Sequence, residues 1–342
     1  MPTTARTVLF HELGGPEVLR IEDVTVPEPG PGQVALRVEA LGLNRAEALF
    51  RAGTYYYRPT LPASRLGYEA SGVVEAVGEG VTELAVGDPV MTGPGIEMGT
   101  QGVHAERVVL PETAVLRRPA SVDAVSGAAA WLTYTTAYGA LLETAGLRPG
   151  DHVVVTGASS GVGTAALQVA RRIGAIPVAT TRTARKRQGL LDAGAAHVVV
   201  TGEPGDGADG PDAGAQAVAR EVRRLTGGRG AEVLFDAIGG PAFRPLAGAL
   251  APGGHAVLYG WLDPRPAEVP WNWPFTIHTY ANMALTSTPE GRRRSSAFLG
   301  AGLADGGFRP VVAEVLDGLD TIRDAHRLLE ENRHTGKVVV RL

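Results

Sequence analysis

The sequence predicts an α/β protein of two domains, in which a doubly wound parallel sheet follows a domain made mainly of strands. The chain has 342 residues, 44% of them hydrophobic and 20% charged, so it can bury a large core and exceeds one average domain. The first third of the chain holds short β-branched runs broken by Gly and Pro. From Asp151 onward, runs typical of strands and helices alternate. Such alternation needs right-handed crossovers and a parallel sheet covered on both faces.

The first third of the chain is predicted to form strands separated by turns. The runs VLRIEDVTV, QVALRVEALGL and ASGVVEAVG have strand composition, and turns separate them. Pro27 to Gly32 exclude a helix, because proline fixes φ and lacks an N–H, and Gly87-Asp88-Pro89 is a second turn. From Val125 the composition becomes helical, and Gly146 stops that helix.

The alternating part has predicted strands at 152–156, 176–180, 197–200, 232–237 and 255–259, with a sixth at 283–286. The helices between them are predicted at 162–173, 184–193, 212–225 and 241–250. The chain ends in an amphipathic helix closed by Gly336 and a last strand whose β texture matches the first domain. We therefore expect residues 1–125 and 289–342 to form one domain and 126–288 the other, inserted into it.

Composition excludes several classes of function. The 36 acidic and 32 basic residues give a formal charge of -4, so the chain lacks the excess of basic residues that is typical of a nucleic-acid binder. There is no cysteine, so disulfides, thiolate metal sites and a cysteine nucleophile are excluded. No run approaches the roughly 18 apolar residues of a membrane helix, and the amino terminus lacks a signal-peptide pattern. We expect a cytoplasmic protein without a membrane partner.

Residues 152–166, HVVVTGASSGVGTAA, form the sharpest local motif. A pyrophosphate at a helix start needs exposed backbone N–H groups and no intervening side chain, and glycines after a strand and before a helix provide both. Short-chain dehydrogenases share this string, but near their amino terminus and with a Tyr-xxx-Lys pair that this chain lacks. The predicted nucleotide contacts are Gly157 for the turn, Ser159 and Ser160 as hydroxyl donors, Gly161 for close approach, Val162, and Gly163 for helix packing.

The residues that follow the second strand of this domain predict NADPH rather than NADH. NAD enzymes place an acid on the ribose about 20 residues beyond the glycines. This chain has no acid there before Asp192. A 2'-phosphate needs a planar Arg fork with hydroxyl and ammonium donors, which are offered here by Thr181, Arg182, Thr183 and Lys186. The other interpretation of this segment is a solvated helix start.

The order of these motifs resembles the zinc-independent branch of the medium-chain dehydrogenase/reductase superfamily, with its quinone oxidoreductases and enoyl reductases. The resemblance covers the chain from about Val18 to its end. It is carried by GLNRAEALFRAGTY (42–55), LGYEASGVVEAVGEGV (66–81), LTYTTAYGAL (132–141), GASSGVG (157–163), TTRTARK (180–186), LFDAIGGP (234–241), GGHAVLYG (253–260) and GKVVV (336–340). It implies a Rossmann NADPH-binding domain inserted in a β-rich GroES-like catalytic domain, and a homodimer that acts on a small molecule.

The residues that would hold a catalytic zinc in this superfamily differ here. Zinc members carry Gly-His-Glu and a cysteine ligand, whereas this chain has Gly67-Tyr68-Glu69 and no cysteine. We therefore predict no metal, with Glu69 as a structural carboxylate. His104 is interpreted as an ordinary polar histidine, with proton donation as the alternative.

At the end of the cofactor where hydride would be transferred, the resemblance implies Asn44 as an amide near the nicotinamide and the substrate oxygen. It places Thr136 and Gly260 beside the nicotinamide. Tyr55 stands where enoyl reductases keep a tyrosine that protonates the intermediate; the alternative is that it only fills space with Tyr56 and Tyr57. Quinone reductases often have Tyr five residues after the Asn, and here Leu49 departs from that pattern.

The predicted function is reduction of an activated C=C bond or a quinone by NADPH, because a conjugated acceptor needs no Lewis acid to spread the developing charge. A reductive cyclisation is a variant of the same chemistry. The alternatives are an NADPH-binding protein with little turnover and a metal-free alcohol dehydrogenase. An aromatic segment, 261–280, could cover a pocket, form a dimer contact or simply pack.

Overall fold

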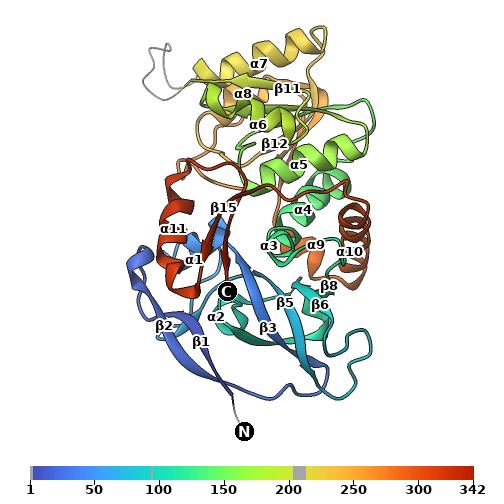
Figure 1. The fold of residues 1–342 in the computed structure, drawn as a ribbon. Coiled ribbons are helices and arrows are strands. Elements are labelled where there is room, and N and C mark those ends of the chain that lie inside the picture. Colours follow the sequence, from blue (N-terminus) through green and yellow to red (C-terminus); the bar gives the residue numbers. More distant parts are fainter. Residues whose placement is uncertain (1–2, 94, 203–212) are drawn as a thin grey trace. The chain divides into compact units, whose positions relative to one another are not determined.

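The computed structural model describes residues 3–93, 95–202 and 213–342, and its contacts divide the chain into two compact units (Figure 1). Unit 1 comprises Met1–Leu132 and Thr286–Leu342, and unit 2 comprises Thr133–Leu285. The chain therefore leaves unit 1 once, builds unit 2, and returns. No helix in the described ranges combines the length and apolar character needed to cross a membrane.

Unit 2 contains a parallel sheet with the order β11-β10-β9-β12-β13-β14 among the described residues. This order reverses direction between β9 and β12, which is the switch point at which such sheets bind ligands. The predicted doubly wound sheet is confirmed. Its strands are β9 (His152–Val155), β10 (Ile176–Thr181), β11 (His197–Val200), β12 (Ala231–Asp236), β13 (Leu250–Leu258) and β14 (Thr276–Thr279).

The helices of unit 2 follow the predicted alternation, with differences at their ends. The predicted helix 184–193 is a 3-10 turn followed by a short helix, and 241–250 is helical only over its middle. The predicted start at Asp212 lies outside the described residues. The helices are α4 (Trp131–Tyr138), which begins in unit 1, the π-helix η3 (Gly139–Thr144), α5 (Gly161–Arg172), η4 (Ala184–Lys186), α6 (Arg187–Asp192), α7 (Ala213–Leu225) and α8 (Phe243–Ala247).

The prediction of a sixth strand at 283–286 is wrong. Residues Asn282–Thr286 form the helix α9, and the sixth strand is β14, which pairs His255↔Thr276 through Leu258↔Thr279 with β13. A short apolar run such as Met-Ala-Leu cannot be assigned by periodicity. Its helical turn is held by the Asn282 side chain, whose Nδ2 donates to Thr135 Oγ1 at 2.9 Å.

Unit 1 is built from two sheets. The strands β2 (Leu19–Val26), β1 (Thr3–Phe10) and β4 (Ser64–Arg65) are neighbours in that order. The larger sheet has the order β15-β16-β3-β5-β6-β8, and β7 also pairs with β3. Its strands are β15 (Val312–Asp317), β16 (Lys337–Arg341), β3 (Gln33–Gly42), β5 (Glu69–Val77), β6 (Pro89–Thr92), β8 (Val115–Arg117) and β7 (Arg107–Pro111).

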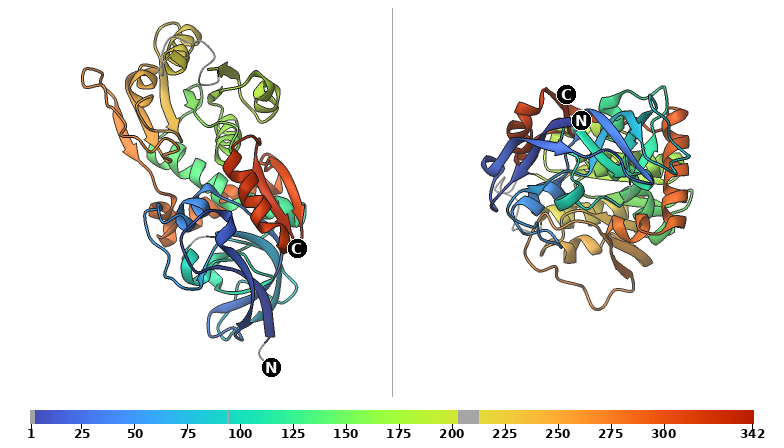
Figure 2. Two further views of the ribbon diagram at one scale, coloured as in Figure 1. Left: turned by 90° about the vertical axis from the view of Figure 1, so that its left-hand side faces the viewer. Right: turned by 90° about the horizontal axis from the view of Figure 1, so that it is seen from below.

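The carboxyl-terminal strand completes a sheet begun near the amino terminus. β16 pairs antiparallel with β3 through Val339↔Gly42 and Val340↔Leu41, so the red end of the chain lies beside blue strands (Figure 2). The helix before it, α11 (Ile322–Glu331), ends at Asn332 with φ +57 and not at Gly336 as predicted. The other helices of the unit are η1 (Pro16–Val18), α1 (Arg45–Arg51), α2 (Met98–Gln101), η2 (Glu112–Ala114), α3 (Ala124–Ala128), α10 (Pro289–Ala304) and η5 (Leu319–Thr321).

Gly42 sets the close packing at the end of β3. A Cβ at this residue would lie 1.8 Å from the carbonyl oxygen of Ala128 in α3, so no other residue fits without moving backbone. The helix α1 begins three residues later, at Arg45. The residue before it, Asn44, therefore lies in the interior of unit 1, where it is only 8% exposed.

Candidate active site

The glycine-rich turn of unit 2 has the geometry of a phosphate cradle. Gly157 adopts φ +55, and the Oγ of Ser160 caps α5 by accepting from the Gly163 N–H at 3.0 Å. A Cβ on Gly163 would lie 2.5 Å from the Gly157 oxygen, so the helix packs directly on the turn. The first N–H groups of a helix have no partner within it, and here Gly161 and Val162 are those residues.

The basic segment predicted to bind a 2'-phosphate reaches this cradle. The Nζ of Lys186 donates to Ser159 Oγ at 3.1 Å across 27 residues of sequence. The Oγ1 of Thr181 accepts from the Thr183 N–H at 3.4 Å, which holds the turn. The Thr183 hydroxyl is buried and finds no partner among the described residues, and Arg182 is exposed beside it. The donor set fits the phosphates of a dinucleotide.

Two residues near the ends of β12 and β13 have structural contacts, and the predicted place of Gly260 beside the nicotinamide stays a prediction. Asp236 accepts from the N–H groups of Ile238 and Gly239 at 3.1 and 3.0 Å, and from Thr156 Oγ1 at 2.5 Å, so it caps the turn after β12. Burial, partly opposed by these hydrogen bonds, raises the pKa of Asp236. A Cβ on Gly260 would lie 2.6 Å from the Ala237 oxygen, so backbone packing alone excludes a side chain there.

Thr136 lies on α4 in unit 2 and is largely buried. Its predicted contact with the nicotinamide stays a prediction, as do the nucleotide contacts of the other cradle residues.

In unit 1, Asn44 is the N-cap of α1 and lies in a buried polar network. Its backbone N–H donates to Glu47 Oε2 at 2.9 Å, and its Nδ2 donates to Glu47 Oε1 and Glu69 Oε2, both at 3.1 Å. Lys337 Nζ donates to Asn44 Oδ1 at 2.6 Å and to Glu69 Oε2 at 2.5 Å. Burial raises the pKa of Glu47, and the charge of Lys337 opposes that effect. Glu69 is thus a structural carboxylate, as predicted.

The tyrosines after α1 form an aromatic group around Phe50. The ring centroids of Tyr55 and Tyr57 lie 5.2 Å apart, and Tyr57 and Phe50 lie 5.1 Å apart. The hydroxyls of Tyr57 and Tyr68 are hydrogen bonded at 2.6 Å. Burial raises the pKa of Tyr55 above its ordinary value and that of Tyr57 to about 12, so both phenols keep their protons at neutral pH. A protonated phenol is able to donate to a substrate oxygen.

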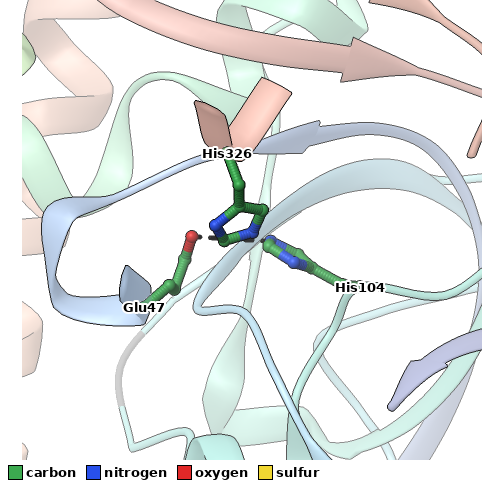
Figure 3. Close-up of side chains that lie close together, drawn as sticks. All are labelled: Glu47, His104 and His326. Carbon is green, nitrogen blue, oxygen red and sulfur yellow. Dashed lines mark ion pairs between the residues drawn. The ribbon is translucent and has the colours of Figure 1, made fainter. Parts of the chain in front are cut away.

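A second buried group of unit 1, Glu47, His104 and His326, has potential metal ligands within 4.8 Å of one another (Figure 3). Two observations on the hydrogen bonds of this group argue against zinc. The oxygens of Glu47 already accept from Asn44 and from the Tyr68 N–H. Arg51 Nη1 donates to His326 Nδ1 at 3.0 Å, because arginine has no acceptor atom. The proton of the neutral His326 ring is therefore on Nε2, so neither ring nitrogen has a lone pair free to bind a metal.

The two histidines are neutral core residues. Burial, with a smaller effect from Lys337, lowers the pKa of His104 to about 3, and burial also lowers the pKa of His326 far below its ordinary value. His104 fills the space opposite Gly67, where a Cβ would lie 2.2 Å from its Cδ2. Neither ring nitrogen of His104 has a hydrogen-bond partner among the described residues, so its interpretation as an ordinary polar histidine stays a prediction.

Sequence reasoning missed Glu47, Lys337 and His326. The spacing Asn44-x-x-Glu47 is a capping-box pattern and could have identified Glu47. Lys337 stands alone after a glycine, and no spacing rule predicts its contact with a residue 293 positions earlier.

Comparison with known proteins places the chain in a family. The family "Alcohol dehydrogenase GroES-like domain" matches residues 30–120, and "Zinc-binding dehydrogenase" matches residues 161–292. The quinone oxidoreductase of Lama guanicoe is 32% identical over 98% of this chain and 97% of its own, and that of Homo sapiens is 30% identical over 98% of each.

Among solved structures, a mycobacterial protein in complex with NADPH has a TM-score of 0.85 at 29% identity, covering 99% of this chain and 100% of its own. Escherichia coli quinone oxidoreductase complexed with NADPH has a TM-score of 0.84 at 25% identity, covering 98% and 99%. The chain therefore belongs to the medium-chain dehydrogenase/reductase superfamily of oxidoreductases, within its quinone oxidoreductase-like group.

Proposed function

We propose that the protein is an NADPH-dependent, zinc-free reductase that transfers hydride to an activated C=C bond of an enone or enoyl compound, or to a quinone. One observation carries the proposal. The hydrogen bond from Lys186 to Ser159 joins the phosphate cradle to the basic segment predicted to read a 2'-phosphate. Together these residues offer donors to two phosphate groups of one dinucleotide.

The residues of unit 2 would hold the cofactor as follows. The pyrophosphate would lie at the start of α5, against the N–H groups of Gly161 and Val162 and the hydroxyls of Ser159 and Ser160. Arg182, with Thr181, Thr183 and Lys186, would bind the 2'-phosphate. When bound, the reduced nicotinamide supplies a hydride.

The residues of unit 1 support chemistry without a metal. Tyr68 stands where zinc members have a histidine ligand, and Glu69 is engaged by the ammonium of Lys337. Neutral donors must then stabilise the charge on the substrate oxygen, which favours a conjugated acceptor whose charge spreads into an enolate. Tyr55 would hydrogen bond that oxygen or protonate the intermediate, with water as the alternative proton source. Asn44 would lie at the same reacting end.

The relatives named quinone oxidoreductase support a quinone as acceptor. Leu49, where quinone reductases often have Tyr, favours an enone over a quinone. The same residue also supports a second candidate, a protein that binds NADPH with little turnover. An enolate that attacks another carbon of the substrate would close a ring, so reductive cyclisation fits the same site.

We also propose a homodimer formed through the edge of the unit 2 sheet. β14 is the last strand in the order of that sheet, and an edge strand presents backbone groups that can pair with a second copy. Beside it Trp271 is 96% exposed, and Val269 and Ile277 are also exposed. Burying these side chains in a subunit contact would remove their apolar surface from water.

The purified protein should oxidise NADPH when an enone or a naphthoquinone is added, as followed by loss of nicotinamide absorbance. Binding of NADPH without turnover of any acceptor would favour the binding protein. Reduction of NADP⁺ by simple alcohols would instead indicate a metal-free alcohol dehydrogenase. Extensive dialysis against a chelator should leave the rate unchanged.

Replacing Arg182 by Ala should weaken NADPH binding about 10- to 100-fold, because a charged hydrogen bond to phosphate contributes roughly 1.5–3 kcal/mol. NADH binding should be unaffected. Fluorescence titration of both nucleotides measures the two affinities, and Arg185→Ala, at an exposed neighbour, is the control. Equal changes for both nucleotides would contradict the assignment of this segment to the 2'-phosphate.

Replacing Tyr55 by Phe should lower kcat by about 100-fold while NADPH affinity is retained, since a positioned proton donor contributes about 10²- to 10⁴-fold. Tyr56→Phe, at a more exposed neighbour, should keep the wild-type rate. An unchanged kcat in the Tyr55 variant would assign the proton to water.

The proposed dimer should dissociate when Ile277 is replaced by Asp, because a carboxylate on the edge strand opposes burial in a subunit contact. Sedimentation velocity of wild type and variant measures the mass of each. A wild-type protein that is monomeric at micromolar concentration would overturn this contact.

A further inference from the structure

Three consecutive tyrosines lie in the segment that follows α1. Residues 52–63, all of which the structure describes, join α1 to β4 without a helix or a strand. The ring centroids of Tyr55 and Tyr56 are 4.4 Å apart, and those of Tyr56 and Tyr57 are 4.9 Å apart. Loops hold their side chains less firmly than helices and strands do, so the hydroxyls of this segment depend on a partner outside it.

Tyr68 can be such a partner, because its backbone is held on both sides. Its N–H donates to Glu47 Oε1 at 3.2 Å, and its carbonyl oxygen accepts from Thr92 Oγ1 at 2.9 Å. The residue before it, Gly67, adopts φ +102, and Tyr68 itself is only 9% exposed. The phenol of Tyr68 therefore extends from a firmly held, buried part of unit 1.

The hydroxyl of Tyr68 meets two tyrosines of the segment. It lies 2.6 Å from Tyr57 Oη, and it also hydrogen bonds the Tyr55 side chain. The Met98 N–H, which can only donate, makes a long contact of 3.5 Å with Tyr57 Oη. Each hydroxyl has one proton, so a chain that begins at this N–H runs from Tyr57 to Tyr68 and from Tyr68 to Tyr55. The Tyr55 proton is then left for an acceptor outside the chain.

The hydrogen bond between Tyr68 and Tyr55 also affects the acidity of Tyr55. Burial raises the pKa of Tyr55, and the hydrogen bond from Tyr68 opposes that effect. Burial also raises the pKa of Tyr68, so its hydroxyl keeps its proton while Tyr55 gives one up. A hydrogen bond to a charged oxygen is stronger than one to a neutral oxygen. Tyr68 therefore stabilises the phenolate form of Tyr55 more than its phenol form.

We propose that Tyr68 is a positioning residue for proton transfer by Tyr55: its hydroxyl donates to Tyr55 Oη and leaves the Tyr55 proton directed at the substrate. This inference rests on the proposed function, in which Tyr55 protonates the reduced substrate. In that step the Tyr55 O–H bond breaks, a C–H or O–H bond forms on the substrate, and the electron pair stays on the Tyr55 oxygen. Water then returns the proton. Tyr68 acts only through Tyr55.

The first test measures the acidity of residue 55 without cofactor or substrate. Tyr55→fluorotyrosine, whose phenol is more acidic than that of tyrosine, is titrated by the absorbance of its phenolate, alone and together with Tyr68→Phe. Tyr68→Phe should raise the pKa of this phenol by about one pH unit, because the charged oxygen loses its donor. Ser71→Ala removes another buried hydroxyl of the same unit, one that donates to the Val90 oxygen, and should leave the titration unchanged.

The second test measures the reduction of an enone by NADPH. Tyr68→Phe should lower kcat about tenfold and leave the KM of both reactants unchanged, since it affects a proton transfer and not binding. Combined with Tyr55→Phe, it should cause no loss beyond that of Tyr55→Phe alone, because both changes act on the same proton. In the fluorotyrosine enzyme, kcat should fall as pH rises through the pKa of residue 55, and Tyr68→Phe should move that fall to higher pH. Ser71→Ala should keep the wild-type rate.

Three results would overturn the proposal, each in a variant that thermal melting shows to be folded: an unchanged titration of residue 55 with Tyr68→Phe, a wild-type kcat in Tyr68→Phe, or additive losses of kcat when Tyr68→Phe is combined with Tyr55→Phe. A protein that binds NADPH but reduces no acceptor would instead refute the proposed reaction. The titration needs no turnover, so it separates a failure of the reaction from a failure of the contact between Tyr68 and Tyr55.

Discussion

The ion pair between Lys337 and Glu69 is the contact on which the buried polar network around Asn44 depends. It joins the start of β16 to the start of β5, and through Asn44 it reaches the corner between β3 and α1. Both charges are buried, so each relies on the other and on backbone donors to offset its loss of water. Removing either partner would leave an uncompensated charge beside the helix cap. The sheet and the candidate site therefore share this one contact.

The same contact bears on the question of a metal. In unit 1 the carboxylates that could face a cation are already bound by Lys337, by Asn44 and by backbone N–H groups. The two buried histidines nearby stay neutral, and Arg51 directs the proton of one of them. Two buried cations, Lys337 and Arg51, supply positive charge in this region. The proposed reduction of a conjugated acceptor would then rely on the tyrosine hydroxyls of unit 1.

Unit 2 follows a different principle, in which backbone and not charge sets the geometry. Gly163 and Gly260 are glycines because main-chain atoms of neighbouring turns approach to within 2.5 and 2.6 Å of where a Cβ would lie. Asp236 holds the turn after β12 by accepting from two backbone N–H groups. At the start of α5 the N–H groups of Gly161 and Val162 have no partner within the helix, which is the arrangement that suits an anion. The proposed role of the basic segment is to add specificity for a 2'-phosphate to a cradle whose geometry backbone packing sets.

Local sequence determined much of this protein. Alternation of strand and helix patterns predicted the parallel sheet, because periodicity reports which face of each element is buried. The glycine-rich motif predicted the cradle, since only glycine suits its turn and packing, and the absence of an acid before Asp192 predicted a phosphate-reading segment. The sixth strand was misplaced because Met283 to Thr286 is too short an apolar run to show a period.

Tertiary structure alone decided which polar groups meet. The capping-box spacing indicates that Asn44 meets Glu47, but nothing in the sequence indicates that the Asn44 amide also donates to Glu69 or that its oxygen accepts from a lysine 293 residues away. The meeting of Lys186 with Ser159 likewise depends on β9 and β10 being neighbours in the sheet. Sequence patterns record local geometry and burial, whereas the partner of a buried charge is set by which distant strands pair, and that is a property of the whole fold.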